Sequence, residues 1–543
     1  MVTHHDAPSL PPNTTTTDLI TVSFPYPSAT GLLPCRWLLI LLFLLLYTLD
    51  LAIPRAFWVQ DEARYGEVVR EMVTEGHWLI PSLGGHPYPD KPAPYFWLVA
   101  GVGGVVGQGE LPFRLVTLAS TAAAALGVYL VALRLLGTGA AFWSTVVFLT
   151  SFLTLIVGHI MRMDMLLTAV SVHAWHSLLC FYQRRERPGW LVAFWGFTVL
   201  GLMVKGPIAF LFTIVPALIW MACEEGGRGI RALRLGAGFA VIMLLVGVWI
   251  GLVEAMGQGA YLWQIWREQL VGRAVESWSH REPVWFYLAL LPLLGMPWSA
   301  WFPVGLRELS RDQPLAFRSL LSFTLLPFVG LSLVSGKLFL YLEPVCPGLS
   351  IVVGSVVALR IASQERVLPS IGWSPFLFFG VLAVGVGWGS VHYLGSSQGV
   401  GLAVTVVLFA FTVVSAAVAR ATEWRWMRTQ LCLSVAFSWL IFVGLMVVMD
   451  PLYSARSLGD FVRTTSGNAP VGICCTTRGV LDYYTGRTLI ELPLGQVNAW
   501  RAAHPEAWLI VPSAVVPTLS GNTCRIHRTF LIEMKEYHVF GGC

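Results

Sequence analysis

Long runs of apolar residues recur along most of this 543-residue chain, and they constrain its fold more than any other feature. Each run is about 17–25 residues long, enough for an α-helix to cross the roughly 30 Å hydrocarbon core of a bilayer. Hydrophobic residues make up 56% of the chain and charged residues only 12%, too few to cover a water-soluble surface. The runs lack the alternation of barrel strands, so the sequence predicts an all-α polytopic membrane protein.

The polar parts of the chain narrow the choice further. The net charge of +5 is not gathered in a basic block, so nucleic acid is not an expected partner. Residues 1–36 are rich in threonine and proline and predict a disordered leader. The first apolar run, 37–53, exceeds a signal-peptide core and lacks a small-residue cleavage site, so we expect a retained helix.

Arginine and lysine in the loops predict the direction of each span. The stretch 95–106 could be a short span or an interfacial helix. The interfacial assignment makes every second loop basic, namely those near 184–187, 228–234, 307–318, 360–366 and 420–428. Further spans are then expected near 113–133, 140–159, 165–182, 189–203, 206–222, 235–253, 284–303, 319–334, 338–359, 372–393, 399–419 and 428–449, which makes thirteen. The positive-inside rule places the N-terminus in the cytoplasm and the tail outside.

This topology divides the chain into a leader (1–36), a transmembrane domain (37–449) and an extracytoplasmic tail (450–543). Two long loops, 55–112 and 254–283, share the outside face with the tail. The tail alternates strand-like runs, such as 471–475, 508–511 and 525–531, with helix-like ones, and predicts a small α/β domain. Its four cysteines would permit a disulfide in an oxidising compartment, but the pairing stays open: Cys474, Cys475, Cys524 and Cys543.

Carboxylates emerge from the membrane at two places on the predicted outside face. Asp61 and Glu62 follow the first span, and Asp164 lies between two long apolar runs. Such groups are costly beside lipid unless water, a partner or a substrate is present. Helix capping, with Asp164 paired to Arg162, is the simpler interpretation of each acid taken alone. It does not explain why both places reach the same face at a similar depth, which favours a site for a charged, membrane-borne substrate.

Four cations accompany these acids on the predicted outside face: Lys91, Lys205, Arg273 and Lys337. A lone lysine at the end of a span often extends to the lipid headgroups. These cations break the positive-inside trend, however, and an anionic ligand such as a phosphate explains their retention better.

The same loops resemble the phospholipid-carrier-dependent glycosyltransferases related to the lipid A aminoarabinose transferase and the protein O-mannosyltransferases. The resemblance covers roughly the first 350 residues. It rests on an ordered set of segments: Asp61-Glu62-Ala63-Arg64-Tyr65, Glu71-Met72, Gly76-His77-Trp78, Pro81, Lys91-Pro92-Ala93-Pro94-Tyr95-Phe96-Trp97, Phe113-Arg114-Leu115, Arg162-Met163-Asp164-Met165, Lys205-Gly206-Pro207, residues 280–287, Pro297-Trp298 and residues 335–341.

The resemblance implies a GT-C membrane fold with thirteen spans and a periplasmic domain. It implies that Asp61 is the catalytic aspartate and Asp164 a second functional aspartate. We add Glu62, next to Asp61, as a third candidate catalytic acid. It implies that Lys91 lies next to the carrier phosphate and that Arg273 and Tyr341 belong to the carrier site, to which we add Lys205 and Lys337.

Two departures from the family pattern bear on metal binding. The usual Glu-Lys-Pro-Pro is here Asp90-Lys91-Pro92-Ala93, and Leu270 stands where relatives often have a histidine. Both changes weaken the case for a metal at Asp90. We therefore expect no cofactor and no metal ligands, and leave a divalent metal as an open alternative.

The expected function is that of an inverting glycosyltransferase in a bacterial inner membrane. Its partners would be a polyprenyl-phosphate sugar donor, an envelope lipid or glycan acceptor such as lipid A, and membrane lipids. The alternatives are a protein O-mannosyltransferase-like enzyme and, from another class, a lipid or glycolipid flippase or transporter, which would place charges in mid-span. The sugar, the acceptor and the role of the tail stay open.

Overall fold

The computed structural model describes residues 35–48, 51, 53, 55–58, 60–265, 267, 282–363, 368–393, 398–476, 478–519, 526–533 and 535–541. The leader up to residue 34, Leu270, Arg273, Cys524 and Cys543 lie outside the described residues.

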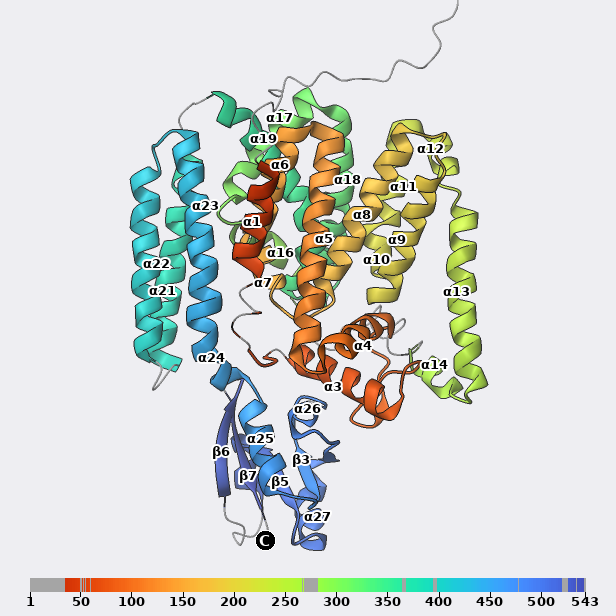
Figure 1. Ribbon diagram of the computed structural model, residues 1–543, viewed down its shortest axis with the longest axis vertical. Helices are drawn as coiled ribbons and strands as arrows, with labels where there is room; N and C mark the ends of the chain where they lie inside the picture. The colour runs from red at the N-terminus through yellow and green to blue at the C-terminus, as the bar shows by residue number, and fades with distance from the viewer. Residues whose placement is uncertain are drawn as a thin grey trace, which may run out of the picture.

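Helices packed side by side form the larger part of the molecule, and the C-terminal domain lies beneath one end of them (Figure 1). The first group is α1 (Cys35–Tyr47), α5 (Glu110–Leu136), α6 (Thr138–Thr150), α7 (Phe152–Val157), α8 (Asp164–Gln183), α9 (Gly189–Lys205), α10 (Ala209–Phe212), α11 (Ile214–Glu225), α12 (Gly227–Ala232), α13 (Leu235–Ala255) and α14 (Gly259–Ile265). The second group is α16 (Phe286–Leu294), η2 (Ser299–Trp301), α17 (Phe302–Asp312), α18 (Pro314–Leu333), η3 (Phe339–Val345), α19 (Cys346–Ser363), α20 (Pro369–Gly372), α21 (Ser374–Tyr393), α22 (Gln398–Val418), α23 (Glu423–Trp439), η5 (Leu440–Leu445) and α24 (Met446–Tyr453).

Seven helical segments of the described chain are long and apolar enough to cross a membrane, which confirms the multi-pass prediction. They are Glu110–Leu136, Asp164–Gln183, Gly227–Ala255, Pro314–Leu333, Phe339–Ile361, Ser374–His392 and Gly401–Val418. An eighth is added if Phe286–Leu294 and Ser299–Asp312, which meet at a bend of 109°, form one span. Shorter apolar helices are Trp37–Tyr47, Pro94–Val106, Thr138–Thr150 and Gly189–Lys205.

Three apolar runs expected as continuous spans are interrupted. The run 140–159 breaks at Ser151, whose backbone is extended (φ −71°, ψ 139°), between α6 and α7. The run 206–222 breaks at Thr213 between α10 and α11. The run 284–303 turns sharply after α16, where Gly295 and Pro297 follow the helix. Glycine, proline and hydroxyl side chains weaken helices locally, and hydropathy averaged over a run does not register such a break.

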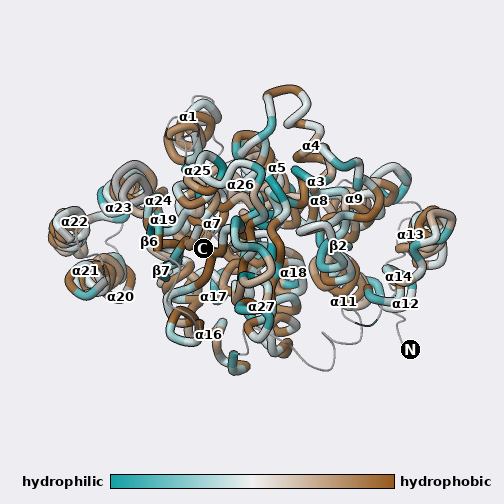
Figure 2. The backbone as a smooth tube through the Cα atoms, turned by 90° about the horizontal axis from the view of Figure 1, so that it is seen from below, coloured by the Kyte–Doolittle hydropathy of each residue, from teal (hydrophilic) through white to brown (hydrophobic). Residues whose placement is uncertain are grey.

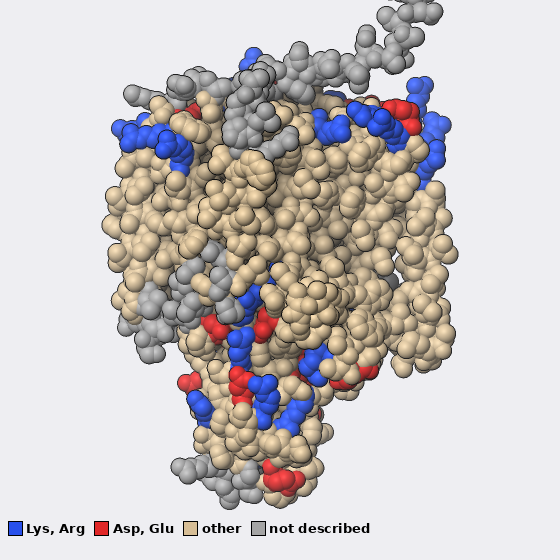
Figure 3. Space-filling view, viewed as in Figure 1, with Lys and Arg blue, Asp and Glu red and all other residues tan. Residues whose placement is uncertain are grey.

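The surface of the bundle carries the signature of a lipid-facing protein. Arginine and lysine gather at one end, the central belt carries almost no charge, and mixed charges reappear toward the C-terminal domain (Figure 3). Helices α13, α21 and α22 stand at the periphery of the bundle (Figure 2) and expose large apolar side chains such as Met243 and Val384. A belt of this kind is what a bilayer would cover.

A short helical layer lies between the bundle and the C-terminal domain (Figure 1). It contains α3 (Gln60–Glu75), the hairpin of β1 (Ser82–Leu83) and β2 (His86–Pro87), and α4 (Pro94–Val106). With 13 residues, α4 is about 20 Å long, too short to cross the hydrocarbon core. It occupies the 95–106 stretch that the loop charges assign to the interface.

The C-terminal domain is a five-stranded sheet in the order β4-β3-β5-β7-β6, confirming the expected α/β tail. Its elements are α25 (Arg456–Thr465), β3 (Val471–Cys474), α26 (Asp482–Thr485), β4 (Ile490–Leu492), η6 (Leu494–Gln496), α27 (Val497–Ala503), β5 (Trp508–Pro512), η7 (Ser513–Thr518), β6 (Ile526–Ile532) and β7 (Lys535–Phe540). Strands β3, β4 and β5 run parallel, and β7 pairs antiparallel with both β5 and β6. Cys474 and Cys475, adjacent in the chain, are disulfide-bonded to each other.

Candidate functional site

Asp61 lies at the start of α3 and meets an arginine from the loop between α7 and α8. Its Oδ2 atom is 2.9 Å from Nη1 of Arg162, and its Oδ1 atom is 3.6 Å from Nη1 of Arg64. Asp61 lies within the first turn of α3 and is 27% exposed. Two segments about one hundred residues apart in the chain are therefore joined by one ion pair.

Asp164 continues this contact into the protein interior. Its carboxylate lies 3.2 Å from Nε of Arg162 and accepts a short hydrogen bond from Nζ of Lys205, at the end of α9. The side chain is only 1% exposed, and Arg162 is 4% exposed. Met163, not Asp164, holds the N-cap position of α8 and makes no side-chain cap, so capping does not account for this acid. Asp61, Arg162, Asp164 and Lys205 form a chain of alternating charges, which we call the ion-pair chain.

Two further predicted site residues border the ion-pair chain. The Lys205 ammonium lies 4.5 Å from the centre of the Tyr341 ring, a cation–π contact. Lys91, from the loop before α4, is close enough for its charge to act on Asp164. The structure thus brings together five predicted residues from separate segments: Asp61, Lys91, Asp164, Lys205 and Tyr341.

Glu62 does not share the surroundings of Asp61, although sequence reasoning groups the two as catalytic acids. Successive residues on a helix point about 100° apart, so neighbouring acids face different environments. Glu62 is fully buried, pairs with both terminal nitrogens of Arg55 at 2.8 Å, and accepts the backbone N–H groups of Trp58 and Met161. Burial alone would raise the pKa of Glu62, but the Arg55 charge and these hydrogen bonds outweigh it and lower the pKa. These contacts anchor the start of α3, and among the described residues Glu62 makes no hydrogen bond or ion pair with the four members of the ion-pair chain.

Lys337 makes a contact outside the ion-pair chain. It is buried, and its ammonium donates a hydrogen bond to the carbonyl of Glu282 at 2.8 Å. This contact joins the segment before α16 to the segment before η3. The expectation that Lys337 belongs to the carrier site stays a prediction.

Arg162 is the central member of the ion-pair chain. From the sequence it is expected only as the partner of a helix-capping Asp164. The available signal was its position: an arginine between two long apolar runs cannot be left uncompensated and must have acidic partners. The segment Met161-Arg162-Met163-Asp164 supplies one such partner, and the second, Asp61, comes from a distant loop.

Metal-ligand atoms gather at one place among the described residues, away from the ion-pair chain. Single ligand atoms of Glu71, Glu75 and His77 lie within 4.8 Å of one another. Glu71 already accepts hydrogen bonds from Ser82 and from the backbone N–H of Gly85. Asp90 lies 3.3 Å from Nη2 of Arg64. An arginine at this distance supplies the positive charge that a carboxylate would otherwise take from a metal ion.

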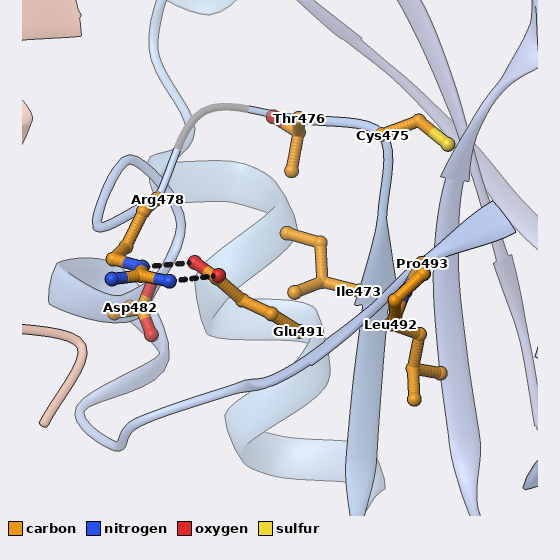
Figure 4. Close-up of a pocket in the computed structure, with 8 residues that line it drawn as sticks. All are labelled: Ile473, Cys475, Thr476, Arg478, Asp482, Glu491, Leu492 and Pro493. Atoms are coloured by element: carbon orange, nitrogen blue, oxygen red, sulfur yellow. Dashed lines mark hydrogen bonds and ion pairs between the residues drawn. The ribbon is translucent and has the colours of Figure 1, made fainter. Parts of the chain in front are cut away.

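A cavity of about 310 Å³ lies in the C-terminal domain, at the carboxyl ends of the parallel strands β3 and β4 (Figure 4). Ligands in open α/β sheets often bind at such strand ends. The two exposed charges in its wall, Arg478 and Glu491, are bound to each other by two hydrogen bonds of 2.7 and 2.8 Å. Because these charges neutralise each other, the cavity offers less to an anionic substrate than the ion-pair chain does.

Glu67 on α3 predicts a measurable pH dependence of stability. Burial raises its pKa to about 7, although Arg70 opposes the rise. The pKa of a glutamate in the unfolded chain is near 4.3. Between this pH and about pH 7 the folded protein keeps a proton on Glu67 that the unfolded chain has lost, so the free energy of unfolding falls as pH increases. We expect the wild type to lose about 3 kcal/mol relative to Glu67→Gln between pH 5 and pH 8. Thermal unfolding of both proteins in detergent measures this. A difference independent of pH would mean that Arg70 keeps Glu67 ionised.

Comparison with known proteins adds to this geometry. The profile of the dolichyl-phosphate-mannose-protein mannosyltransferase family matches residues 90–250. The undecaprenyl phosphate-alpha-4-amino-4-deoxy-L-arabinose arabinosyl transferase of Pectobacterium carotovorum is 30% identical over 407 residues, 72% of each chain. The undecaprenyl phosphate-alpha-4-amino-4-deoxy-L-arabinose arabinosyl transferase 1 of Proteus mirabilis is 27% identical to this chain over 356 residues. The match spans 64% of the Proteus mirabilis protein and 66% of the one from Erwinia tasmaniensis, just under two thirds of each.

Similarity in three dimensions extends over almost the whole chain. The crystal structure of ArnT from Cupriavidus metallidurans bound to undecaprenyl phosphate superposes with a TM-score of 0.72 at 19% sequence identity. The superposition covers 95% of this chain and 99% of that one, so the bundle and the C-terminal domain share one fold with it.

Proposed function

This chain belongs to the family of undecaprenyl phosphate-alpha-4-amino-4-deoxy-L-arabinose arabinosyl transferases, and from this membership we propose that it is an inverting glycosyltransferase. It moves a sugar from a polyprenyl-phosphate carrier to an envelope acceptor, with lipid A as the first candidate. The donor carrier is undecaprenyl phosphate, as in the names of its relatives. The transfer takes place in the inner membrane, at its periplasmic face.

The ion-pair chain is the observation that carries this proposal. Its two negative and two positive charges balance. Asp61, at one end of the ion-pair chain, is 27% exposed, whereas Asp164 is 1% exposed. Asp61 is therefore the carboxylate that can meet a substrate. Lys91 adds a positive charge beside the chain, and an anionic phosphate is the natural ligand for it.

In the proposed reaction an oxygen of the acceptor attacks the anomeric carbon from the face opposite the carrier phosphate. The carbon–oxygen bond to the phosphate breaks, and the carrier leaves with both electrons and one additional negative charge. Lys91, with Arg273 from the long loop, stabilises that charge. For a hydroxyl acceptor, Asp61 takes the proton. For a phosphate acceptor no proton needs to be removed, and Asp61 then acts by orienting the acceptor.

Arg162 and Lys205 hold the two aspartates in place. Arg162 contacts both carboxylates, and Lys205 binds Asp164 while its ammonium lies over Tyr341. Because charges fixed before the reaction need no reorganisation during it, this arrangement favours the transfer step.

The proposed topology has thirteen spans, with the N-terminus in the cytoplasm and the C-terminal domain in the periplasm. The end of the bundle that carries mostly arginine and lysine supports this direction, since positive loops stay on the cytoplasmic side (Figure 3). The ion-pair chain and the C-terminal domain then share the periplasmic side. Cysteine labelling of intact cells at exposed Glu491 and at Arg311 tests this: only a cysteine at 491 should react with a membrane-impermeant reagent.

The direct test of the function is transfer by the purified protein in lipid nanodiscs. Undecaprenyl-phosphate aminoarabinose and lipid A are supplied, and mass spectrometry follows modified lipid A and released undecaprenyl phosphate. We expect both products in equal amounts. Release of neither, with redistribution of the lipid between leaflets of a vesicle, would instead support a flippase.

The match of residues 90–250 to the mannosyltransferase profile favours a second candidate, transfer of mannose to protein hydroxyl groups. The same assay with a polyprenyl-phosphate mannose donor and an acceptor peptide separates the two. Glycopeptide formation without modified lipid A would establish this second candidate.

A further inference from the structure

Residues 55–58 lie shortly before α3, the helix that carries Asp61, and two residues from the C-terminal fifth of the chain bind them. The backbone N–H of Ala56 donates to Oδ1 of Asp450 at 2.9 Å, and the indole N–H of Trp58 donates to the same oxygen. The backbone N–H of Phe57 donates to the hydroxyl of Tyr484 at 2.8 Å. These backbone donors have no helix or strand to satisfy them, so their position depends on acceptors 394 and 427 residues away.

Tyr484 is itself fixed from the bundle. Its hydroxyl donates to the Glu110 carboxylate at 2.8 Å, and the same carboxylate oxygen lies 2.7 Å from Nη2 of Arg456. Glu110 is the first residue of α5, and Arg456 is the first residue of α25. The hydroxyl therefore lies between a transmembrane helix and the segment before Asp61.

Aromatic packing brings the same parts close together. The Phe57 ring lies 5.0 Å from that of Tyr483 and 5.1 Å from that of Phe113. On the facing side of α3, a Cβ at Gly66 would come within 2.5 Å of the Phe57 ring and 3.0 Å of the Tyr483 ring. Only a glycine lets α3 approach this closely, so the helix that carries Asp61 rests directly on the segment that the C-terminal domain holds.

We propose that Asp450, on α24 at the end of the bundle, and Tyr484, on α26 of the C-terminal domain, are positioning residues for Asp61, and that through Tyr484 the C-terminal domain is part of the catalytic unit. They act through the Ala56–Trp58 backbone, while the buried pair of Arg55 with Glu62 ties the same segment to α3 from the other side. The inference rests on the proposed function for its kinetic consequence, but the contacts themselves are independent of it.

The kinetic test uses two variants that each remove one acceptor, Asp450→Ala and Tyr484→Phe. Loss of an acceptor for a buried donor should misplace Asp61, and we expect kcat to fall about tenfold with each variant. KM for the donor should stay within about twofold, because the carrier site itself is intact. Asp450→Asn keeps an accepting oxygen and should recover most of the rate. The control, Asp460→Ala on the exposed face of α25, removes a carboxylate whose one partner among the described residues is its neighbour Arg463, and should leave kcat unchanged.

A double-mutant cycle separates positioning from general loss of structure. If Tyr484 acts through Asp61, adding Tyr484→Phe to Asp61→Asn should lower the residual rate less than twofold. Additive losses, or a rise in KM equal to the fall in kcat, would overturn the assignment.

Amide hydrogen exchange tests the contacts without any assay of activity. Exchange at residues 56–58 should accelerate at least tenfold in Asp450→Ala and Tyr484→Phe but not in Asp460→Ala. Unchanged exchange in both variants would refute the inference even if the enzyme is active. Accelerated exchange in a protein that transfers no sugar would leave the contact established and count against the proposed function.

Discussion

Replacing Arg162 with methionine should reduce transfer at least about 100-fold and lower the free energy of unfolding by about 3–5 kcal/mol. Methionine fills much of the volume but leaves Asp61 and Asp164 without the guanidinium that lies between them. Asp164 is almost fully buried, so a carboxylate deprived of one of its two cations is costly there. Steady-state transfer and thermal unfolding in detergent measure the two effects.

Two controls accompany this variant. Arg162→Lys keeps the charge but cannot contact both carboxylates through separate nitrogens of a planar group. Its transfer rate and its free energy of unfolding should therefore lie between those of the wild type and of Arg162→Met. Arg463→Met removes an exposed ion pair on α25 and should change stability by less than about 0.5 kcal/mol. If Arg162→Met folds stably and keeps its full rate, the ion-pair chain has no part in catalysis.

Asp61→Asn should lower kcat about 10²–10⁴-fold with a hydroxyl acceptor and far less with a phosphate acceptor. Asparagine retains an oxygen that can accept from Arg162, so the geometry is largely preserved while the ability to take a proton is lost. Parallel assays with lipid A bearing a free phosphate and with a hydroxyl acceptor measure the ratio. Thermal unfolding should change little, because Asp61 is partly exposed.

The comparison between acceptors decides what Asp61 does. Equal losses with both acceptors would rule out proton transfer and leave orientation as its role. Asp460→Asn, the same change on an exposed surface, controls for effects of removing a carboxylate.

Hydropathy and loop charge predicted the polytopic bundle, and the alternation of strand-like and helix-like runs predicted the α/β tail, because both patterns are local in the sequence. The interruptions at Ser151, at Thr213 and after α16 were not predicted. When the residues around a helix break stay apolar, the mean hydropathy of the segment hardly changes. Hydropathy averaged over a whole span therefore cannot locate the break. Strands β4 and β7 were also not predicted, for a different reason. Short strands in a small domain are stabilised by pairing with neighbouring strands, which the local sequence does not show.

The candidate site could be predicted only where a residue's type and predicted side of the membrane were both informative. Asp61, Asp164 and Lys205 met both conditions and lie in one cluster. Glu62 has the right chemistry but points elsewhere, because helix periodicity separates it from Asp61. Lys337 has the right charge and the predicted side, yet it binds a backbone carbonyl.

The contacts of the C-terminal domain with the segment before Asp61 could not be predicted at all. Phe57 and Tyr484 are 427 residues apart, and neither belongs to a motif that indicates the other. Local sequence describes the two ends of the chain separately, and only the folded bundle brings them together.

The length of α5 has a consequence for how the surrounding lipid acts on this protein. Its 27 residues extend about 40 Å, roughly 10 Å more than the hydrocarbon thickness, and its N-terminal turn presents Glu110 to Tyr484 and Arg456. A thicker membrane would draw that turn toward the acyl chains and strain the contact, whereas a thinner one would leave it in water. Acyl-chain length should therefore change the transfer rate through hydrophobic mismatch, separately from any contact of the bulk lipid with the reacting groups.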